Sequence, residues 1–292
     1  MENETKFSRR AALGALSASA IAAALPARGE GDAPAAEAPA QGKFKYSACK
    51  WCYSKMSIEE LAAAGAKIGL QGIDLLDVGE VPKLEGTGLV CSLANGPSPI
   101  PKGWNDPELH DKLVERSEEL LPKIAAAGVE RMIVFSGNRW GRSDLEGMRN
   151  CARGLRRITP LAESLGVTIV MELLNSKRDH KDYMCDHTAW GAELVQRVAS
   201  DRFKLLYDIY HMQIMEGDVV ATIEEHHAAI DHYHTGGVPG RHEIDERQEL
   251  FYPRVCRAIA DTGFTGWLAQ EFIPADPDPV ASLEAALKIC RV

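Results

Sequence analysis

The stretch Phe203–Asp218, FKLLYDIYHMQIMEGD, is the most informative part of the sequence, because in it an apolar run ends in an acid just before a helical segment begins. Asp208 shares a strand face with Leu206, a residue typical of the interior, since side chains alternate between the two faces of a strand. Burying the Asp208 charge is costly unless a cation or hydrogen-bond donors meet it. The stretch therefore predicts a buried strand that ends at a carboxylate with a partner.

Three other apolar runs also end in a residue that can bind a metal: Glu172 in TIVMELLN, His234 in IDHYHTGG and Glu271 in GWLAQEF. Together with Asp208, these positions are separated by 36, 26 and 37 residues. Each gap is long enough for a loop and a helix that return the chain to a parallel strand. We therefore expect the four side chains to meet at one end of a parallel sheet.

Strand and helix patterns alternate along the rest of the chain. Strands are predicted at residues 44–49, 72–77, 88–94, 131–137, 168–174, 203–208, 230–236 and 266–272. Helical patterns follow most of them, such as 57–69, with Ser57 as cap and Glu60 in the capping-box position, and 143–166, where Pro160 predicts a kink. Eight alternating units indicate an α/β fold, a single (β/α)8 TIM barrel.

The competing architecture is an open doubly wound sheet. It usually has a glycine-rich turn after its first strand, which SACKWCYS lacks.

The N-terminal segment differs from the rest of the chain. Ser8, Arg9 and Arg10 precede a small-residue apolar run over residues 11–27, an order that resembles a bacterial twin-arginine export signal. A disordered or amphipathic N-terminus is the alternative. Residues 28–42, rich in Ala and Pro, are expected to be a spacer, and residues 43–292 the catalytic TIM barrel. The predicted location is outside the cytoplasm, in the periplasm or cell envelope.

Composition limits the partners. The formal net charge of −9 over 292 residues argues against nucleic acid as a ligand, since binding the phosphate backbone requires basic surface. After the leader, charged residues interrupt every apolar run before it reaches the length of a membrane span. Seven scattered cysteines do not fit a disulfide framework. The expected partner is a small-molecule substrate, and assembly into a homo-oligomer stays open.

The four strand-end residues suit a metal site. In a TIM barrel the active site forms at the carboxyl ends of the strands, where all four are expected. Crowded carboxylates repel one another, whereas a divalent cation turns that repulsion into coordination. A lone acid at a strand end is more often a helix cap, and a lone histidine in a strand is more often a core residue. Four such residues, each separated from the next by about one strand–loop–helix unit, favour a metal site. We therefore expect one divalent ion held by Glu172, Asp208, His234 and Glu271. Mn2+ and Mg2+ are the preferred candidates, and Co2+ and Zn2+ are the alternatives. His232, one pleat repeat deeper, is expected outside the ligand set.

The chain is similar to the hydroxypyruvate isomerase family of the xylose-isomerase-like TIM barrels. The resemblance covers nearly all of residues 44–292 and is most specific in DIYHMQIMEGD (208–218), H-x-H-x-x-x-VPGRHE (232–243), MELLNS and GWLAQEF. It implies Glu172, Asp208, His234 and Glu271 as metal ligands. It also implies that Glu172 and Glu271 form the proton-transfer pair, with His211 and Arg241 holding substrate oxygens. Hydroxypyruvate isomerases typically have glutamine in place of His234, whereas related ketose 3-epimerases have histidine.

The function implied is metal-dependent isomerisation of a small hydroxy-carbonyl compound through an enediolate, with the two glutamates moving the proton. Arg241 can hold a substrate carboxylate, and its structural alternative is an ion pair with Glu243 or Asp245. A ketose 3-epimerase or another sugar isomerase is the first alternative function. A metal-dependent phosphodiesterase and a non-catalytic sugar-binding barrel are the alternatives from other classes.

Overall fold

Eight parallel strands close into a barrel in the computed structural model, which describes residues 44–292. The strands are β1 (Lys45–Cys49), β2 (Gly72–Leu76), β3 (Val90–Ala94), β4 (Arg131–Val134), β5 (Thr168–Glu172), β6 (Phe203–Asp208), β7 (Ile230–Thr235) and β8 (Trp267–Gln270). Each strand pairs with its sequence neighbour, and β8 pairs with β1. The predicted (β/α)8 barrel is confirmed. The predicted export signal and the spacer lie outside the described residues.

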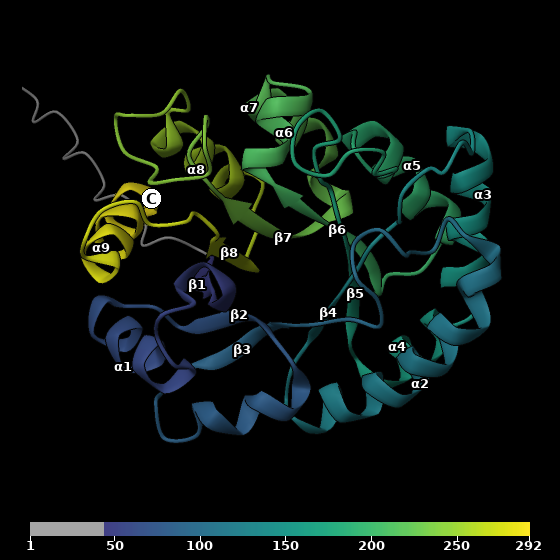
Figure 1. Cartoon of the computed structure of the whole chain (residues 1–292), viewed down its shortest axis with the longest axis horizontal. Coiled ribbons are helices and arrows are strands. Elements are labelled where there is room, and N and C mark those ends of the chain that lie inside the picture. The colour runs from purple at the N-terminus through teal and green to yellow at the C-terminus, as the bar shows by residue number, and fades with distance from the viewer. Residues whose placement is uncertain (1–43) are drawn as a thin grey trace, which may run out of the picture. The chain divides into compact units, whose positions relative to one another are not determined.

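Helices form an outer layer around the strands (Figure 1). The α-helices are α1 (Ile58–Ile68), α2 (His110–Ala126), α3 (Asp144–Leu155), α4 (Thr159–Leu165), α5 (Thr188–Val198), α6 (Ile209–Met215), α7 (Val219–His226), α8 (Tyr252–Asp261) and α9 (Pro279–Cys290). The 3-10 helices are η1 (Lys50–Tyr53), η2 (Val78–Leu84), η3 (Pro107–Leu109) and η4 (His227–Ala229). Among the residues described, no helix combines the length and the hydropathy required to cross a membrane.

Local sequence explains where α1 begins and ends. The Ser57 hydroxyl accepts the Glu60 N–H at 3.1 Å, and the Glu60 carboxylate accepts the Ser57 N–H at 2.7 Å. This reciprocal pair satisfies two backbone donors that a helix start leaves without partners. Gly69 ends the helix at φ 96°, a left-handed conformation that glycine adopts without steric cost. The capping box predicted from Ser57 and Glu60 is confirmed.

The prediction of one kinked helix over residues 143–166 is wrong. The chain forms α3, capped by the Ser143 hydroxyl, and a separate α4 that begins at Thr159. Pro160 lies in the first turn of α4, where its missing N–H costs no intrahelical hydrogen bond. The proline therefore starts a second helix instead of bending the first.

A small apolar cluster fills the barrel beneath the strand ends. It consists of Leu93, Ile133, Val170 and Leu206, from four consecutive strands, all buried. Since alternate residues of a strand share a face, Glu172 and Asp208 project into the barrel one layer beyond Val170 and Leu206. The packed apolar interior thus lies directly beneath the carboxylates of Glu172 and Asp208.

Candidate metal centre and active site

The structure brings the four predicted ligands together. Glu172 and Asp208 are the last residues of β5 and β6, His234 lies near the end of β7, and Glu271 directly follows β8. The β6–β7 register pairs Asp208 with His234. All four residues are buried, and one ligand atom from each lies within 4.8 Å of the others. The convergence expected from sequence spacing is therefore present.

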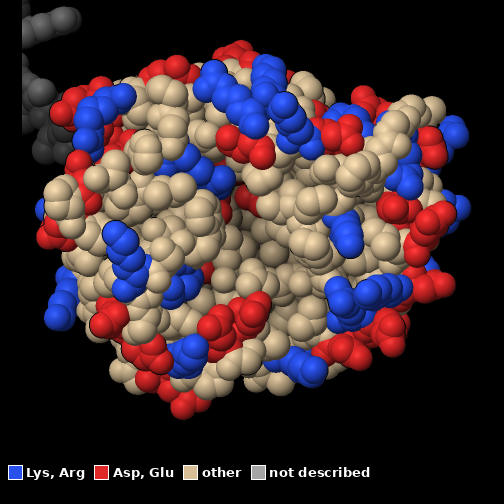
Figure 2. Space-filling view, in the orientation of Figure 1, with Lys and Arg blue, Asp and Glu red and all other residues tan. Residues whose placement is uncertain are grey.

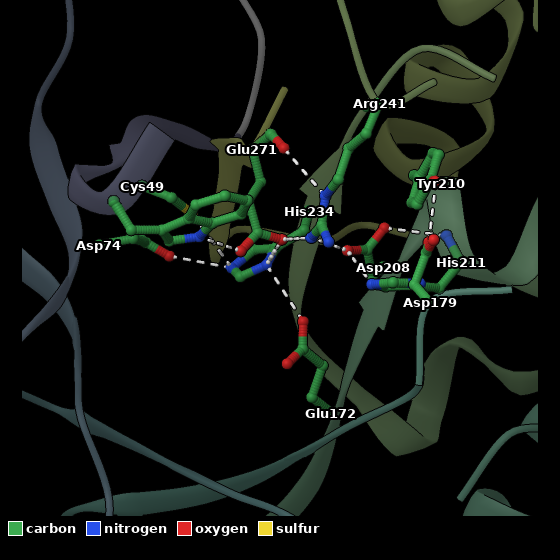
Figure 3. Close-up of polar contacts among 12 residues, drawn as sticks. Cys49, Asp74, Glu172, Asp179, Asp208, Tyr210, His211, His234, Arg241 and Glu271 are labelled. Atoms are coloured by element: carbon green, nitrogen blue, oxygen red, sulfur yellow. Dashed lines mark hydrogen bonds and ion pairs between the residues drawn. The ribbon is translucent and has the colours of Figure 1, made fainter. Parts of the chain in front are cut away.

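The His234 ring lies between the carboxylates (Figure 3). Its Nδ1 atom is 2.7 Å from Glu271 Oε2 and 3.6 Å from Glu172 Oε1. Three buried carboxylates and one imidazole nitrogen are the oxygen-rich, mixed donor set that Mn2+, Mg2+, Co2+ and Zn2+ accept. The residues present therefore fit a divalent ion.

Charge in the site is unevenly distributed among the acids. Burial raises the pKa of Glu172, and the nearby Glu271 carboxylate raises it further against the opposing effect of His234. Burial also raises the pKa of Asp208 well above its usual range. Although burial acts on Glu271 in the same direction, Arg241 and His234 hold the pKa of that carboxyl well below its usual range. Glu172 and Glu271, which both lie next to His234, thus have pKa values shifted in opposite directions.

Arg241 contacts the carboxylates directly. Its Nη2 atom donates to Glu271 Oε2 at 2.5 Å and to Asp208 Oδ2 at 3.0 Å. The guanidinium carbon lies 5.1 Å from the ring centroids of both Trp51 and Tyr210, within the range of cation–π attraction. The sequence left open a structural role in which Arg241 pairs with Glu243 or Asp245. Among the described residues, Arg241 instead pairs with Asp208 and Glu271. Arg241 belongs to the site.

His211 presents an N–H group to the same space. The Asn175 side-chain oxygen accepts the backbone N–H groups of Arg178 and Asp179 at 3.0 and 2.9 Å, which places its NH2 group toward His211 Nδ1, 2.6 Å away. His211 Nδ1 is therefore the acceptor, and Nε2 holds the hydrogen. No hydrogen-bond partner among residues 44–292 takes the Nε2–H, which lies 3.5 Å from Asp208 Oδ2. Burial, aided by Arg241, lowers the pKa of His211 well below its usual value, so the ring is neutral.

Three contributors to the site were missed from the sequence. Trp51 on η1 donates its indole N–H to Glu271 Oε1 at 2.7 Å, and Asn175 orients His211. Asp74 on β2, fully buried, contacts both His232 and His234. The sequence does contain a signal for Asp74, because it is a charged residue inside the apolar run GIDLL. It contains no signal for Asn175, since its position three residues after Glu172 does not indicate a contact with His211. His232 lies outside the four-residue cluster, as predicted.

Basic and acidic side chains are interspersed over the face seen in Figure 2, which is hollowed near the centre of the barrel. All seven cysteines are free thiols, in keeping with the predicted lack of a disulfide framework.

Sequence comparison matches residues 53–291 to the family model described as xylose isomerase-like TIM barrel. A 2-oxo-tetronate isomerase of Cupriavidus necator is 35% identical over 113 residues, which is 39% of this chain and 43% of that protein. A Drosophila melanogaster protein, provisionally named a hydroxypyruvate isomerase, is 37% identical over 105 residues, or 36% of this chain and 39% of that protein. Both matches thus span less than half the length of the relative.

Solved structures share the architecture. A Brucella melitensis protein titled AP endonuclease, family 2, superposes with a TM-score of 0.71 at 23% identity and covers 82% of this chain and 96% of its own. A D-psicose 3-epimerase from Clostridium cellulolyticum, solved with D-tagatose, gives 0.70 at 18% identity, with 85% and 98% covered. At such identities the likeness concerns the fold, because one fold hosts several chemistries.

Proposed function

The chain belongs to the xylose isomerase-like TIM barrel family, and on this premise we propose that it is a divalent-metal-dependent isomerase of a small hydroxy-carbonyl compound. The convergence of Glu172, Asp208, His234 and Glu271 within 4.8 Å carries the proposal. The isomerase names of the two relatives support it. These four residues would hold the ion, which when bound supplies positive charge against developing negative charge on substrate oxygens.

The two glutamates act as base and acid. The ionised one of Glu172 and Glu271 removes a proton from the carbon next to the substrate carbonyl; the electron pair of the broken C–H bond forms a C=C bond, and the carbonyl electron pair moves onto its oxygen to give an enediolate. The other glutamate, protonated, gives its proton to the adjacent carbon, and the substrate hydroxyl proton passes to the former carbonyl oxygen, so ketone and aldehyde exchange places without an external oxidant. In hydroxypyruvate, the first candidate substrate, the proton leaves C3 and arrives at C2, giving 2-hydroxy-3-oxopropanoate.

Two side chains complete the substrate site. The neutral His211 ring offers its Nε2–H to a substrate oxygen, and Arg241, held between two aromatic rings, offers its guanidinium. Both donors are fixed by neighbouring groups before substrate binds, which reduces the reorganisation that stabilising an oxyanion requires. A small keto acid or a short sugar with adjacent oxygens matches this donor set.

A ketose 3-epimerase is the second candidate. It is favoured by the histidine at position 234, where hydroxypyruvate isomerases typically have glutamine. An epimerase would return the proton to the opposite face of the carbon that lost it, using the same pair of glutamates. The two candidates therefore differ only in where the second glutamate delivers the proton.

An activity panel tests the proposal. The purified protein, reconstituted with Mn2+, is incubated with hydroxypyruvate, 2-oxo-tetronate and a set of ketoses, and products are followed by proton NMR. We expect turnover of at least one compound, with the product identifying the carbon that accepts the proton. Bound Mn2+ without turnover of any compound in the panel would contradict the proposed reaction and favour a sugar-binding barrel.

A further inference from the structure

Asp74 gathers an unusual set of hydrogen bonds below the proposed metal centre. Its Oδ1 atom accepts the hydroxyls of Ser47, at 2.6 Å, and Ser92. Its Oδ2 atom contacts Nε2 of His232 at 2.5 Å and Nε2 of His234 at 3.2 Å. The donors come from β1, β3 and β7. One carboxylate thus joins side chains from several parts of the barrel wall.

These contacts leave Asp74 unable to serve as a metal ligand itself. Each carboxylate oxygen already receives two donors, which uses the approximately four acceptor sites of an ionised carboxyl group. Cys49, Asp74 and His234 also lie within 4.8 Å of one another, but this trio contains a single carboxylate, and that carboxylate already receives four donors. That trio therefore lacks the free anionic ligands of the Glu172, Asp208 and Glu271 group.

The Asp74 carboxylate determines which His234 nitrogen can meet a metal. Because an ionised carboxylate only accepts hydrogen bonds, Nε2 of His234 must hold a hydrogen toward Asp74. Nδ1 is then the nitrogen left to bind a cation, and it is Nδ1 that faces Glu271 and Glu172.

We propose that Asp74 is the positioning residue of the metal centre, a carboxylate that holds His234 with Nε2 protonated and Nδ1 directed at the ion. The inference rests on the proposed metal-dependent function and adds a residue to it. Figure 3 shows the arrangement, with Asp74 and Cys49 on one side of the imidazole and Asp208 and Arg241 on the other. Carboxylates that accept the second N–H of a ligating histidine typically strengthen metal binding by about 10- to 100-fold.

Calorimetric titration with Mn2+ tests the role of Asp74. Asp74→Asn keeps the shape of the side chain, but its NH2 group replaces one acceptor oxygen, so the Kd for Mn2+ should rise by about 10- to 100-fold. Asp77→Asn is the matched control, since Asp77 follows the same strand, is exposed and pairs with Asn95. An Asp74→Asn affinity equal to that of wild type would overturn the inference. A wild-type protein that bound no Mn2+ would overturn the proposed function as well, so the two failures are distinguishable.

A second measurement applies if Asp74→Asn fails to fold. Nitrogen-15 NMR of histidine-labelled wild-type protein loaded with Zn2+, a diamagnetic ion, reports which ring nitrogen bears hydrogen. We expect the His234 signal to show a protonated Nε2 and a metal-bound Nδ1. A hydrogen on Nδ1 with the ion on Nε2 would contradict the assignment of Asp74.

Discussion

Glu172 and Glu271 approach His234 Nδ1 from β5 and from the end of β8, at 3.6 and 2.7 Å. Replacing either glutamate by glutamine preserves its size but removes the group that accepts the proton. The turnover rate in the Mn2+-loaded enzyme should therefore fall by roughly 10²-fold or more for each variant. Steady-state kinetics with metal analysis measures it, and Glu224→Gln, an exposed surface glutamate paired with Arg254, is the control. Near-normal rates in both variants with metal retained would rule out the proton shuttle.

His211 is proposed to contribute a hydrogen-bond donor to the substrate site and is not one of the four proposed metal ligands. His211→Phe removes the Nε2–H and keeps an aromatic ring against His180 and Tyr210, whose ring centroids lie 5.3 and 5.0 Å away. We expect kcat to fall by roughly 10²-fold, the lower range for loss of one oxyanion donor, with bound Mn2+ unchanged. Gln213→Ala on the same helix is the control. Loss of metal in His211→Phe would instead assign His211 to the ligand set.

At the scale of elements, Asp186 ties the loop after β5 to the loop after β4. Its carboxylate accepts Arg139 at 3.1 and 3.2 Å, Ser176 at 2.5 Å and His187 at 2.8 Å. Burial raises the pKa of Asp186, but these hydrogen bonds outweigh it and hold the pKa below its usual value. A carboxyl whose pKa is lower in the folded than in the unfolded chain stabilises the fold at neutral pH. This stabilisation disappears as the pH falls through the folded pKa, below about 4.

Asp186→Asn should therefore lower the free energy of unfolding at pH 7, and its difference from wild type should shrink as the pH approaches about 3. Urea unfolding at several pH values measures this difference. Asp144→Asn, which removes a 64% exposed partner of the same arginine, should change stability little, because solvent screens that pair. A gap between Asp186→Asn and wild type that stayed constant with pH would show that the carboxylate charge is not what stabilises the loops.

Sequence patterns predicted the elements that carry the four central residues because each strand ends at a polar side chain after a buried run. Asp74 was not predicted as a site residue because the alternation of side chains between the two faces of the strand fails in β2. Its pairing with β3 shifts register on both sides of Asp74, and Leu75 has a φ of 62°. Asn175 was not predicted as a site residue because its partner His211 lies on α6, 36 residues later, and only the closed barrel brings the two together. Local periodicity specifies a strand, whereas these contacts depend on tertiary geometry.

At the scale of the whole molecule, we propose export of the folded protein by the twin-arginine route, from Ser8, Arg9 and Arg10 and the apolar run that follows them. Replacing both arginines by lysine keeps the charge and should leave the precursor in the cytoplasm. Cell fractionation with immunodetection measures the distribution, and Lys6→Arg serves as a control that alters a basic residue outside the pair. Export of the double variant at the wild-type level would exclude this route.

Metal binding should also stabilise the barrel as a whole, because an ion held by residues from β5, β6 and β7 and the end of β8 binds only the folded state. Chelation of the ion should lower the Tm, and added Mn2+ should restore it, with a rise that above the Kd grows with the logarithm of the free Mn2+ concentration. Differential scanning calorimetry measures both effects. A Tm that is the same with chelator and with excess Mn2+ would indicate that no ion bridges these strands.

Native mass spectrometry after Mn2+ reconstitution shows whether the four strand-end residues hold an ion, because it counts ions on each folded chain. The wild-type protein should hold one Mn2+ per chain. Asp208→Ala, which removes one of the three carboxylates of the cluster, should hold little or none under the same conditions. A wild-type chain without Mn2+, or an Asp208→Ala chain that still holds one Mn2+, would contradict the proposed metal site.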